Sequence, residues 1–253
     1  MNFGAALRKE LLEQLRSYRL LITAVVLTLF GILSPLFARY TPDIIRLALP
    51  QGEEITKLIP PPSAADSVAQ YLKNITQFGV LLALLMAMGL VAQEKDKGTA
   101  ALMLSKPLGR SAFLLAKFCS LALTFTLSIV LAGAAGYYYT LVLFGPMDPG
   151  GWLGLNGLVL VFLLVYVSLT LLCSTLTKSQ VLAGGLATGV WMILSLVGAL
   201  PGIGDYSPRQ VIGWAAALGT GGSPAQWPAL AFSLALIVGG LAGACVLFNR
   251  QEL

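Results

Sequence analysis

The chain has 253 residues, of which 57% are hydrophobic and only 11% are charged, and its mean hydropathy is +0.83. Because ordinary globular domains carry about 25% charged residues, this composition excludes a soluble domain and predicts a membrane protein. The net charge of +5 forms no basic stripe with interleaved aromatic residues, so no nucleic-acid partner is expected. The absence of histidine excludes Ser-His-Asp triads and histidine-bound zinc, and no metal site is expected.

Residues 1–19 predict an amphipathic helix that lies in the headgroup plane of the membrane. The basic residues Arg8 and Lys9 fall outside its apolar stripe and are expected to lie near anionic lipid. The stripe itself contains Phe3, Leu7, Leu11, Leu15 and Tyr18. Two roles remain open for this interfacial helix, which are a simple membrane anchor and a contact with a cytoplasmic partner.

Six apolar runs are each long enough to cross a bilayer, so the fold class is all-α and polytopic within one transmembrane domain, 1–253. The predicted spans are 20–38, 75–93, 111–139, 152–176, 181–200 and 226–248. Between them lie an outer loop with helices (39–74), a cytoplasmic loop (94–110) and an outer re-entrant or interfacial helix (201–225). Eleven of the sixteen Lys and Arg residues lie on the side that holds both termini, which places both termini in the cytoplasm.

The first outer loop carries helix signals. Thr41-Pro42 predicts the start of a short helix, with proline at its first helical position. Ser63 and Asp66 have the spacing of a capping box. Helical spacing continues from there into the second span, so one long helix is predicted over 64–93.

Similar signals mark the later helix ends. Ser111 is expected to cap the third span, and residues 145–151 are expected to form a tight outer turn. Ser207-Pro208 and Ser223-Pro224 each combine a capping residue with a following proline. The first pair is expected to open an outer helix of about eleven residues, too short to cross the membrane. The second pair is expected to open the sixth span.

The densest charge in the chain lies between the second and third spans. A short apolar segment, Thr99–Ser105, is bounded there by Gly98 and Pro107, which predicts a helix of about two turns. Charged residues surround it, namely Glu94, Lys95, Asp96, Lys97, Lys106, Arg110 and Lys117. A short charged helix held between two spans is typical of a docking surface for a water-soluble partner.

The sequence of this region contains a pattern of residues that is shared with a known family. The pattern runs Glu94, Gly98-Thr99, Leu104-Ser105-Lys106-Pro107, Gly109-Arg110 and Lys117-Phe118. It resembles the first cytoplasmic loop of the type-2 ABC exporter permeases, and the likeness extends less specifically to the six spans. The resemblance implies a permease subunit in a prokaryotic cytoplasmic (inner) membrane. It also implies a dimer with a second copy or a paralogous permease.

The resemblance further implies that a separate ATPase subunit docks on the loop and carries ATP and Mg, while this chain binds no cofactor. The residues expected to couple to that ATPase are Glu94, Lys95, Gly98, Thr99, Leu102, Pro107 and Arg110. Glu94 and Arg110 are expected to make charge-assisted contacts with it. The outer helix is expected to act as a gate, with Ser207, Pro208 and Trp214 as its site residues.

The chain contains no Gly-x-x-x-x-Gly-Lys-[Ser/Thr] motif, so it is not expected to hydrolyse ATP or to be an enzyme. Lys117 is the one charged residue inside a predicted span, which disfavours a proton-coupled carrier and favours a hydrophobic or amphiphilic cargo. Two other functions remain as alternatives. One is an ATP-independent membrane carrier or assembly scaffold, and the other is an intramembrane enzyme acting on lipid.

Glycine recurs in the later spans and indicates faces where helices approach closely. The glycines are Gly133 and Gly136, then Gly184, Gly185 and Gly189, and finally Gly239, Gly240 and Gly243. These faces are expected either to pack within one subunit or to form the seam of a dimer.

Overall fold

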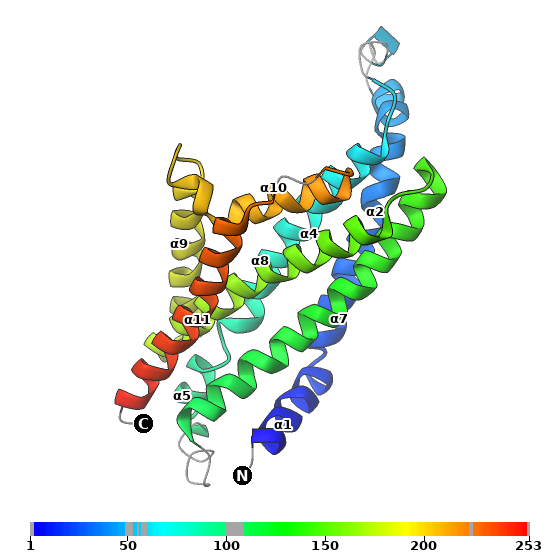
Figure 1. The fold of residues 1–253 in the computed structure, drawn as a ribbon. Coiled ribbons are helices and arrows are strands. Elements are labelled where there is room, and N and C mark those ends of the chain that lie inside the picture. Colours follow the sequence, from blue (N-terminus) through cyan, green and yellow to red (C-terminus); the bar gives the residue numbers. More distant parts are fainter. Residues whose placement is uncertain are drawn as a thin grey trace.

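A computed structural model of the chain describes residues 3–48, 53–54, 56, 60–99, 109–222 and 225–251. Within these ranges all regular structure is helical, and six helices are long and apolar enough to cross a membrane, which confirms the predicted fold class. These spans are α2 (Arg19–Ala48), α4 with α5 (Ala64–Ala87 and Ala92–Asp96), α7 (Arg110–Phe144), α8 (Pro149–Leu176), α9 (Gln180–Val197) and α11 (Trp227–Arg250). Figure 1 shows an elongated bundle with both termini at the same end.

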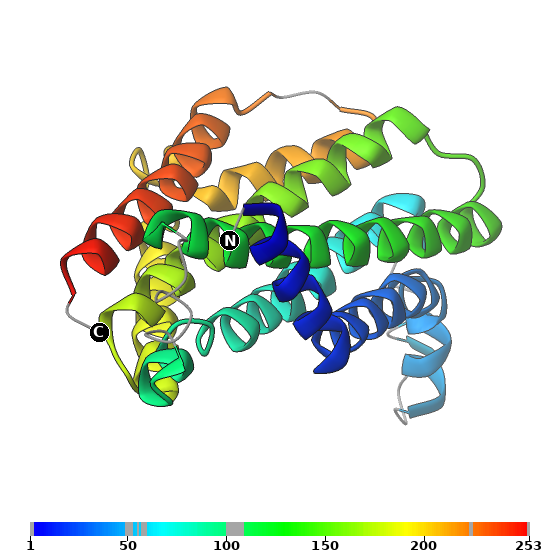
Figure 2. The ribbon, with the colours of Figure 1, turned by 90° about the horizontal axis from the view of Figure 1, so that it is seen from below.

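The predicted interfacial helix is present as α1 (Phe3–Arg16), and it crosses α7 beneath the bundle (Figure 2). The face that it turns toward the protein differs from the apolar stripe, because its buried residues are Ala6, Glu10 and Gln14. Two members of the stripe, Phe3 and Leu15, are exposed instead. This orientation leaves apolar side chains available to lipid and points polar side chains into the bundle.

The first span does not end where the sequence predicts. The helix α2 continues through Pro35 and Pro42 to Ala48, so the separate helix expected to start at Thr41-Pro42 is wrong. The hydroxyls of Ser34 and Thr41, which directly precede the two prolines, donate to carbonyl oxygens one turn earlier. Hydroxyl groups and neighbouring helices commonly sustain proline-containing helices in membranes, and α2 packs along both α4 and α7.

The second span begins as predicted but is not one helix. The amide of Ser63 donates to the Asp66 carboxylate at 2.8 Å, which confirms the capping box. The predicted uninterrupted helix over 64–93 is wrong, because a turn at 88–91 separates α4 from α5. The cause is a side chain from α8: the Ser174 hydroxyl oxygen accepts the amides of Val91 and Ala92 at 3.1 and 3.0 Å and donates to the Met88 carbonyl at 2.8 Å.

Two further helix starts differ from the sequence prediction. The helix α7 begins at Arg110 with Gly109 in the cap position, so Ser111 lies inside its first turn. The helix α8 begins at Pro149, because the Asp148 carboxylate accepts amides from the first turn at 3.1 and 2.7 Å. Residues 149–151 therefore belong to α8 and not to the outer turn.

The end of the bundle opposite the termini carries the short 3-10 helix η1 (Gly204–Tyr206) and the crosswise helix α10 (Pro208–Gly219), as Figure 1 shows. A short helix that starts at Pro208 and ends at Gly219, as predicted, therefore follows the fifth span. Ser223-Pro224 lies outside the described residues, but α11 starts only at Trp227, so the predicted start at that pair is wrong.

The glycines divide into two groups. A Cβ atom at Gly31, Gly133 or Gly136 would lie within about 3 Å of a neighbouring helix, so these positions permit close packing within the chain. Gly185 and Gly189 on α9 have no such neighbour, and α9 buries only two residues, Ala183 and Ala187. Packing within one subunit therefore accounts for the glycines of the first group. It does not account for Gly185 and Gly189 of α9.

Candidate functional site

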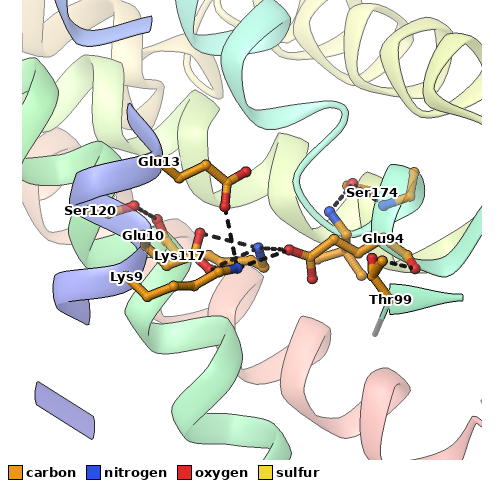
Figure 3. A network of polar contacts seen from close by, with 10 residues as sticks. Lys9, Glu10, Glu13, Glu94, Thr99, Lys117, Ser120 and Ser174 are labelled. Atoms are coloured by element: carbon orange, nitrogen blue, oxygen red, sulfur yellow. Dashed lines mark hydrogen bonds and ion pairs between the residues drawn. The ribbon is translucent and has the colours of Figure 1, made fainter. Parts of the chain in front are cut away.

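Five charged side chains from three helices meet at the end of the bundle that carries the termini (Figure 3). The ammonium of Lys117 on α7 lies 2.7 Å from Oε1 of Glu94 on α5 and 3.2 Å from both carboxylate oxygens of Glu10 on α1. The ammonium of Lys9 lies 3.0 Å from Glu10, 3.2 Å from Glu13 and 3.5 Å from Glu94. We call these five residues the charge cluster.

Two members of the charge cluster are almost completely removed from solvent. The side chains of Lys117 and Glu10 are 1% and 4% exposed, and the ring of Phe113 lies 4.9 Å from the Lys117 ammonium. Burial of a single ion costs several kcal/mol, so each of these charges depends on the other. The cluster therefore fixes the position of α1 against α7 more strongly than a pair of surface ions would.

The ionised forms of the two more exposed members are also favoured. Burial opposes the charge on Lys9, but the carboxylates of Glu10 and Glu94 outweigh it and raise the pKa of Lys9 above its ordinary value. Burial likewise opposes the charge on Glu13, while Lys117 and Lys9 lower the pKa of that carboxyl below 4.5. Both groups are consequently charged at neutral pH.

The three carboxylates of the cluster also have the spacing of metal ligands. Oxygens of Glu10, Glu13 and Glu94 lie within 4.8 Å of one another. The ammonium groups of Lys9 and Lys117 lie among these oxygens and already supply two positive charges to them. These carboxylates are thus already paired with lysine cations.

Local structure explains how Glu94 reaches the cluster. The turn at 88–91 separates α4 from α5, and Glu94 lies in the first turn of α5. Ser174 holds this turn through three hydrogen bonds (Figure 3). A side chain of α8 therefore determines where a carboxylate of α5 lies.

The two other basic residues predicted for this site bind the ends of helices. Nη1 of Arg110 donates to the carbonyls of Phe248 and Gln251, at 3.1 and 2.8 Å, where α11 ends. The Lys95 ammonium donates to the carbonyl of Thr175 at 2.7 Å and to the side chain of Gln251 at 3.1 Å. Cations are favourable at helix C-termini, and these contacts join the flanks of the loop between α5 and α7 to α8 and α11.

Of the four remaining residues predicted to couple to the ATPase, the structure describes two, Gly98 and Thr99. Gly98 follows α5 with a φ of +67°, a conformation that glycine adopts readily. Thr99 is exposed, and its hydroxyl donates to the carbonyl of Glu94 at 3.3 Å. Leu102 and Pro107 lie outside the described residues. Glu94 and Arg110, for which contacts with a partner are predicted, both bind groups of their own chain.

Sequence reasoning placed Lys9 on the interfacial helix, Lys117 in the third span and Glu94 in the loop, but it did not join them. It also gave no role to Glu10 or Glu13. The signal was Lys117 itself, because a single cation inside an apolar run requires an anionic partner. Of the other predicted interfacial residues, Arg8 and Leu15 are exposed and Leu11 is half-buried.

The predicted outer-gate residues lie at the opposite end of the bundle. Pro208 is in the first turn of α10, and Ser207 precedes it with a buried hydroxyl that has no hydrogen-bond partner among the described residues. Trp214 packs edge-to-face on Trp227 of α11, with ring centroids 5.0 Å apart. These residues share no contact with the charge cluster, so they form a second and separate region.

Comparison with known proteins agrees with this architecture. A family model described as ABC-2 family transporter protein matches residues 5–253. The chain is also 26% identical over 210 residues to the uncharacterized transmembrane protein YxlG of Bacillus subtilis (strain 168), which covers 82% of this chain and 81% of that protein. The family match includes the charge cluster, all six spans and the outer helices. The chain therefore belongs to the ABC-2 family of transporter proteins.

Proposed function

We propose that this chain is the transmembrane permease subunit of an ATP-driven exporter, and that a separate ATPase subunit docks on its cytoplasmic end. Family membership supports the permease role. The charge cluster is the observation that supports coupling, because Glu94 stands at the start of the loop and is joined by ion pairs to α7 and α1. A force on the loop would be shared by three helices.

The contacts suggest a route for that force. The charge cluster would carry movement of α5 to α1 and α7, while Arg110 and Lys95 would carry it to the ends of α11 and α8. Glu94 and Arg110 would therefore transmit movement from inside the chain. Exposed residues of the loop, including Gly98 and Thr99, would meet the ATPase, which would hold ATP and Mg.

The proposed pathway lies between two permease chains. The helix α9 exposes large apolar side chains, including Val181 at 83% and Leu196 at 68%, which a second copy or a paralogous permease would cover. Lys117 is the one acidic or basic side chain within the six predicted apolar runs; it lies near the start of α7 and is already paired. Such walls suit a hydrophobic or amphiphilic cargo.

We further propose that the protein lies in the cytoplasmic membrane of a prokaryote, with both termini and the loop in the cytoplasm. The distribution of Lys and Arg supports that orientation. Movement of the cargo would then be outward, with α10 and its residues Ser207, Pro208 and Trp214 at the exit. ATP hydrolysis would take place on the partner, so the chain itself is not an enzyme.

The test is purification of the tagged chain from its native membrane in mild detergent, with stoichiometry measured by mass spectrometry. The expected result is an ATPase with a Walker-A motif at close to one copy per permease. The double substitution Glu94→Ala with Arg110→Ala should reduce ATP hydrolysis stimulated by the permease. Arg39→Ala, on the outer side, is the matched control and should have no effect.

Two results would contradict the proposal. One is recovery of the chain alone under conditions that preserve other complexes of this kind, which would favour an ATP-independent carrier or an assembly scaffold. The other is unchanged ATPase binding and hydrolysis in the double variant. The second result would leave the permease role intact and remove the role of these two residues in coupling.

A further inference from the structure

A cavity of about 630 Å³ lies at the end of the bundle away from the termini. Its walls come from α4, from α10 and from the residues that follow α9. The polar and charged side chains around it are Lys73 and Thr76 of α4 and Arg209 and Gln210 of α10. This cavity is distinct from the charge cluster, which lies at the opposite end of the molecule (Figure 1).

The two cations of the cavity, Lys73 and Arg209, have no anionic partner among the residues that the structure describes. Neither Lys73 nor Arg209 forms an ion pair with any other residue in the described part of the chain. The acid nearest to Lys73 along α4, Asp66, is occupied by the amide and hydroxyl of Ser63, at 2.8 and 2.7 Å. Asp205, one turn before Arg209, is exposed and also forms no ion pair. The cavity thus presents two uncompensated positive charges.

The rest of the cavity wall is apolar. Leu72 and Ile212 line it, and so do Gly198 and Ala199 just after α9. Leu196, which lies on α9 two residues before Gly198, is 68% exposed and adds apolar surface at this end of α9. A ligand with an anionic group and an apolar chain would match both surfaces at once. Arginine is well suited to an oxyanion such as phosphate, because its planar guanidinium donates two parallel hydrogen bonds.

We propose that this cavity binds the anionic headgroup of an amphiphile, whose apolar chain lies along the exposed face at the end of α9. This assignment rests on the proposed function, since it names an anionic amphiphile as the class of cargo that the exporter releases at its outer end. A neutral hydrophobic cargo would leave Lys73 and Arg209 without a counter-charge. An inorganic anion would leave the apolar wall uncovered.

The test is a lipid titration of the purified full-length chain in detergent, followed by native mass spectrometry. Phosphatidylglycerol and phosphatidylcholine with identical acyl chains serve as the anionic and zwitterionic probes. The expected result is a preference of about tenfold for phosphatidylglycerol, because both lipids carry the same phosphodiester and only phosphatidylcholine adds a quaternary ammonium, whose like charge Lys73 and Arg209 repel. Lys73→Gln with Arg209→Gln should abolish this preference, while Arg209→Lys should retain part of it.

Arg46→Gln is the matched control, because Arg46 is a cation of α2 that does not line the cavity. It should retain the full preference. Equal binding of the two lipids, or an undiminished preference in the double variant, would overturn the proposal. Displacement of phosphatidylglycerol by millimolar inorganic phosphate would also overturn it, by showing a site for free anions. The titration uses no ATPase. A negative titration would therefore reject lipid binding in this cavity without bearing on whether an ATPase subunit binds the chain.

Discussion

The ammonium of Lys117 lies 2.7 Å from Oε1 of Glu94, although 23 positions separate the two residues along the chain. Glu94 is the first residue of the loop predicted over 94–110 and Lys117 follows that loop, so this ion pair closes the base of the loop. Glu10 contacts the same ammonium from α1. A displacement of the loop therefore cannot remain local without breaking an ion pair that is largely buried.

Replacement of Lys117 by methionine should strongly destabilise the protein. The substitution leaves the Glu10 carboxylate buried without the cation that now lies 3.2 Å from both of its oxygens. Removal of one partner from a buried ion pair typically costs about 3–5 kcal/mol. The measurement is the thermal unfolding midpoint in detergent, together with cross-linking between α1 and α7.

Lys97→Met is the control for this substitution, because Lys97 is exposed and forms no ion pair in the described ranges. The double variant Lys117→Met with Glu10→Met should recover much of the lost stability, since paired apolar residues can replace a buried ion pair. If Lys117→Met were no more harmful than Lys97→Met, the charge cluster would not hold α1 in place.

Ser174→Ala should weaken the connection between α8 and the turn at 88–91. The substitution removes the acceptor of two buried amides, and unsatisfied buried groups cost about 1–3 kcal/mol each. We expect a lower unfolding midpoint and reduced stimulation of the partner ATPase. Ser168→Ala is the control, because Ser168 is equally buried on α8 but its hydroxyl donates only within its own helix, to Val165 at 2.8 Å. Equal effects of both substitutions would contradict the proposed role of Ser174.

The contribution of Glu13 to stability should depend on pH. Its pKa is lowered in the folded protein relative to the ordinary 4.5, so its stabilising effect is complete above that value and is lost as the pH falls below it. The difference in unfolding midpoint between the wild type and Glu13→Gln should therefore be constant from about pH 6 to 8 and should shrink below pH 4.5. A difference that grew on acidification would contradict the ion pairing with Lys9.

The large-scale fold was predictable because its signals are local. Apolar runs of sufficient length identify spans, and the Ser63–Asp66 pair identifies the start of α4 from a spacing of three residues. The interruption at 88–91 was not predictable in this way. It depends on Ser174, whose hydroxyl belongs to a helix more than 80 positions away along the chain.

The candidate site was predictable in position but not in its contacts. Charge density between two spans indicated Glu94 and Arg110, and both lie at the end of the bundle that carries the termini. Their partners could not be identified, because Glu10 belongs to an amphipathic helix whose polar face is ordinarily solvated. Only the packing of α1 against α7 converts that surface carboxylate into a buried one.

Close packing of α2 against α7 depends on Gly31. A Cβ atom at this position would lie 2.4 Å from the carbonyl oxygen of Ala132, which is backbone and cannot turn aside. Gly31→Ala should therefore force the two helices apart and destabilise the protein by about 1–3 kcal/mol, as overpacking generally does. The unfolding midpoint in detergent and a disulfide cross-link between α2 and α7 would measure the effect.

Gly189→Ala on α9 provides the comparison, since a Cβ atom there meets no other residue within 4 Å. Alanine is favoured over glycine in a helix by up to about 1 kcal/mol, so this variant should be at least as stable as the wild type when monomeric. If a second copy covers α9, the same variant should alter self-association while leaving monomer stability unchanged. Equal destabilisation by both substitutions would show that loss of glycine itself, and not the contact with Ala132, is responsible.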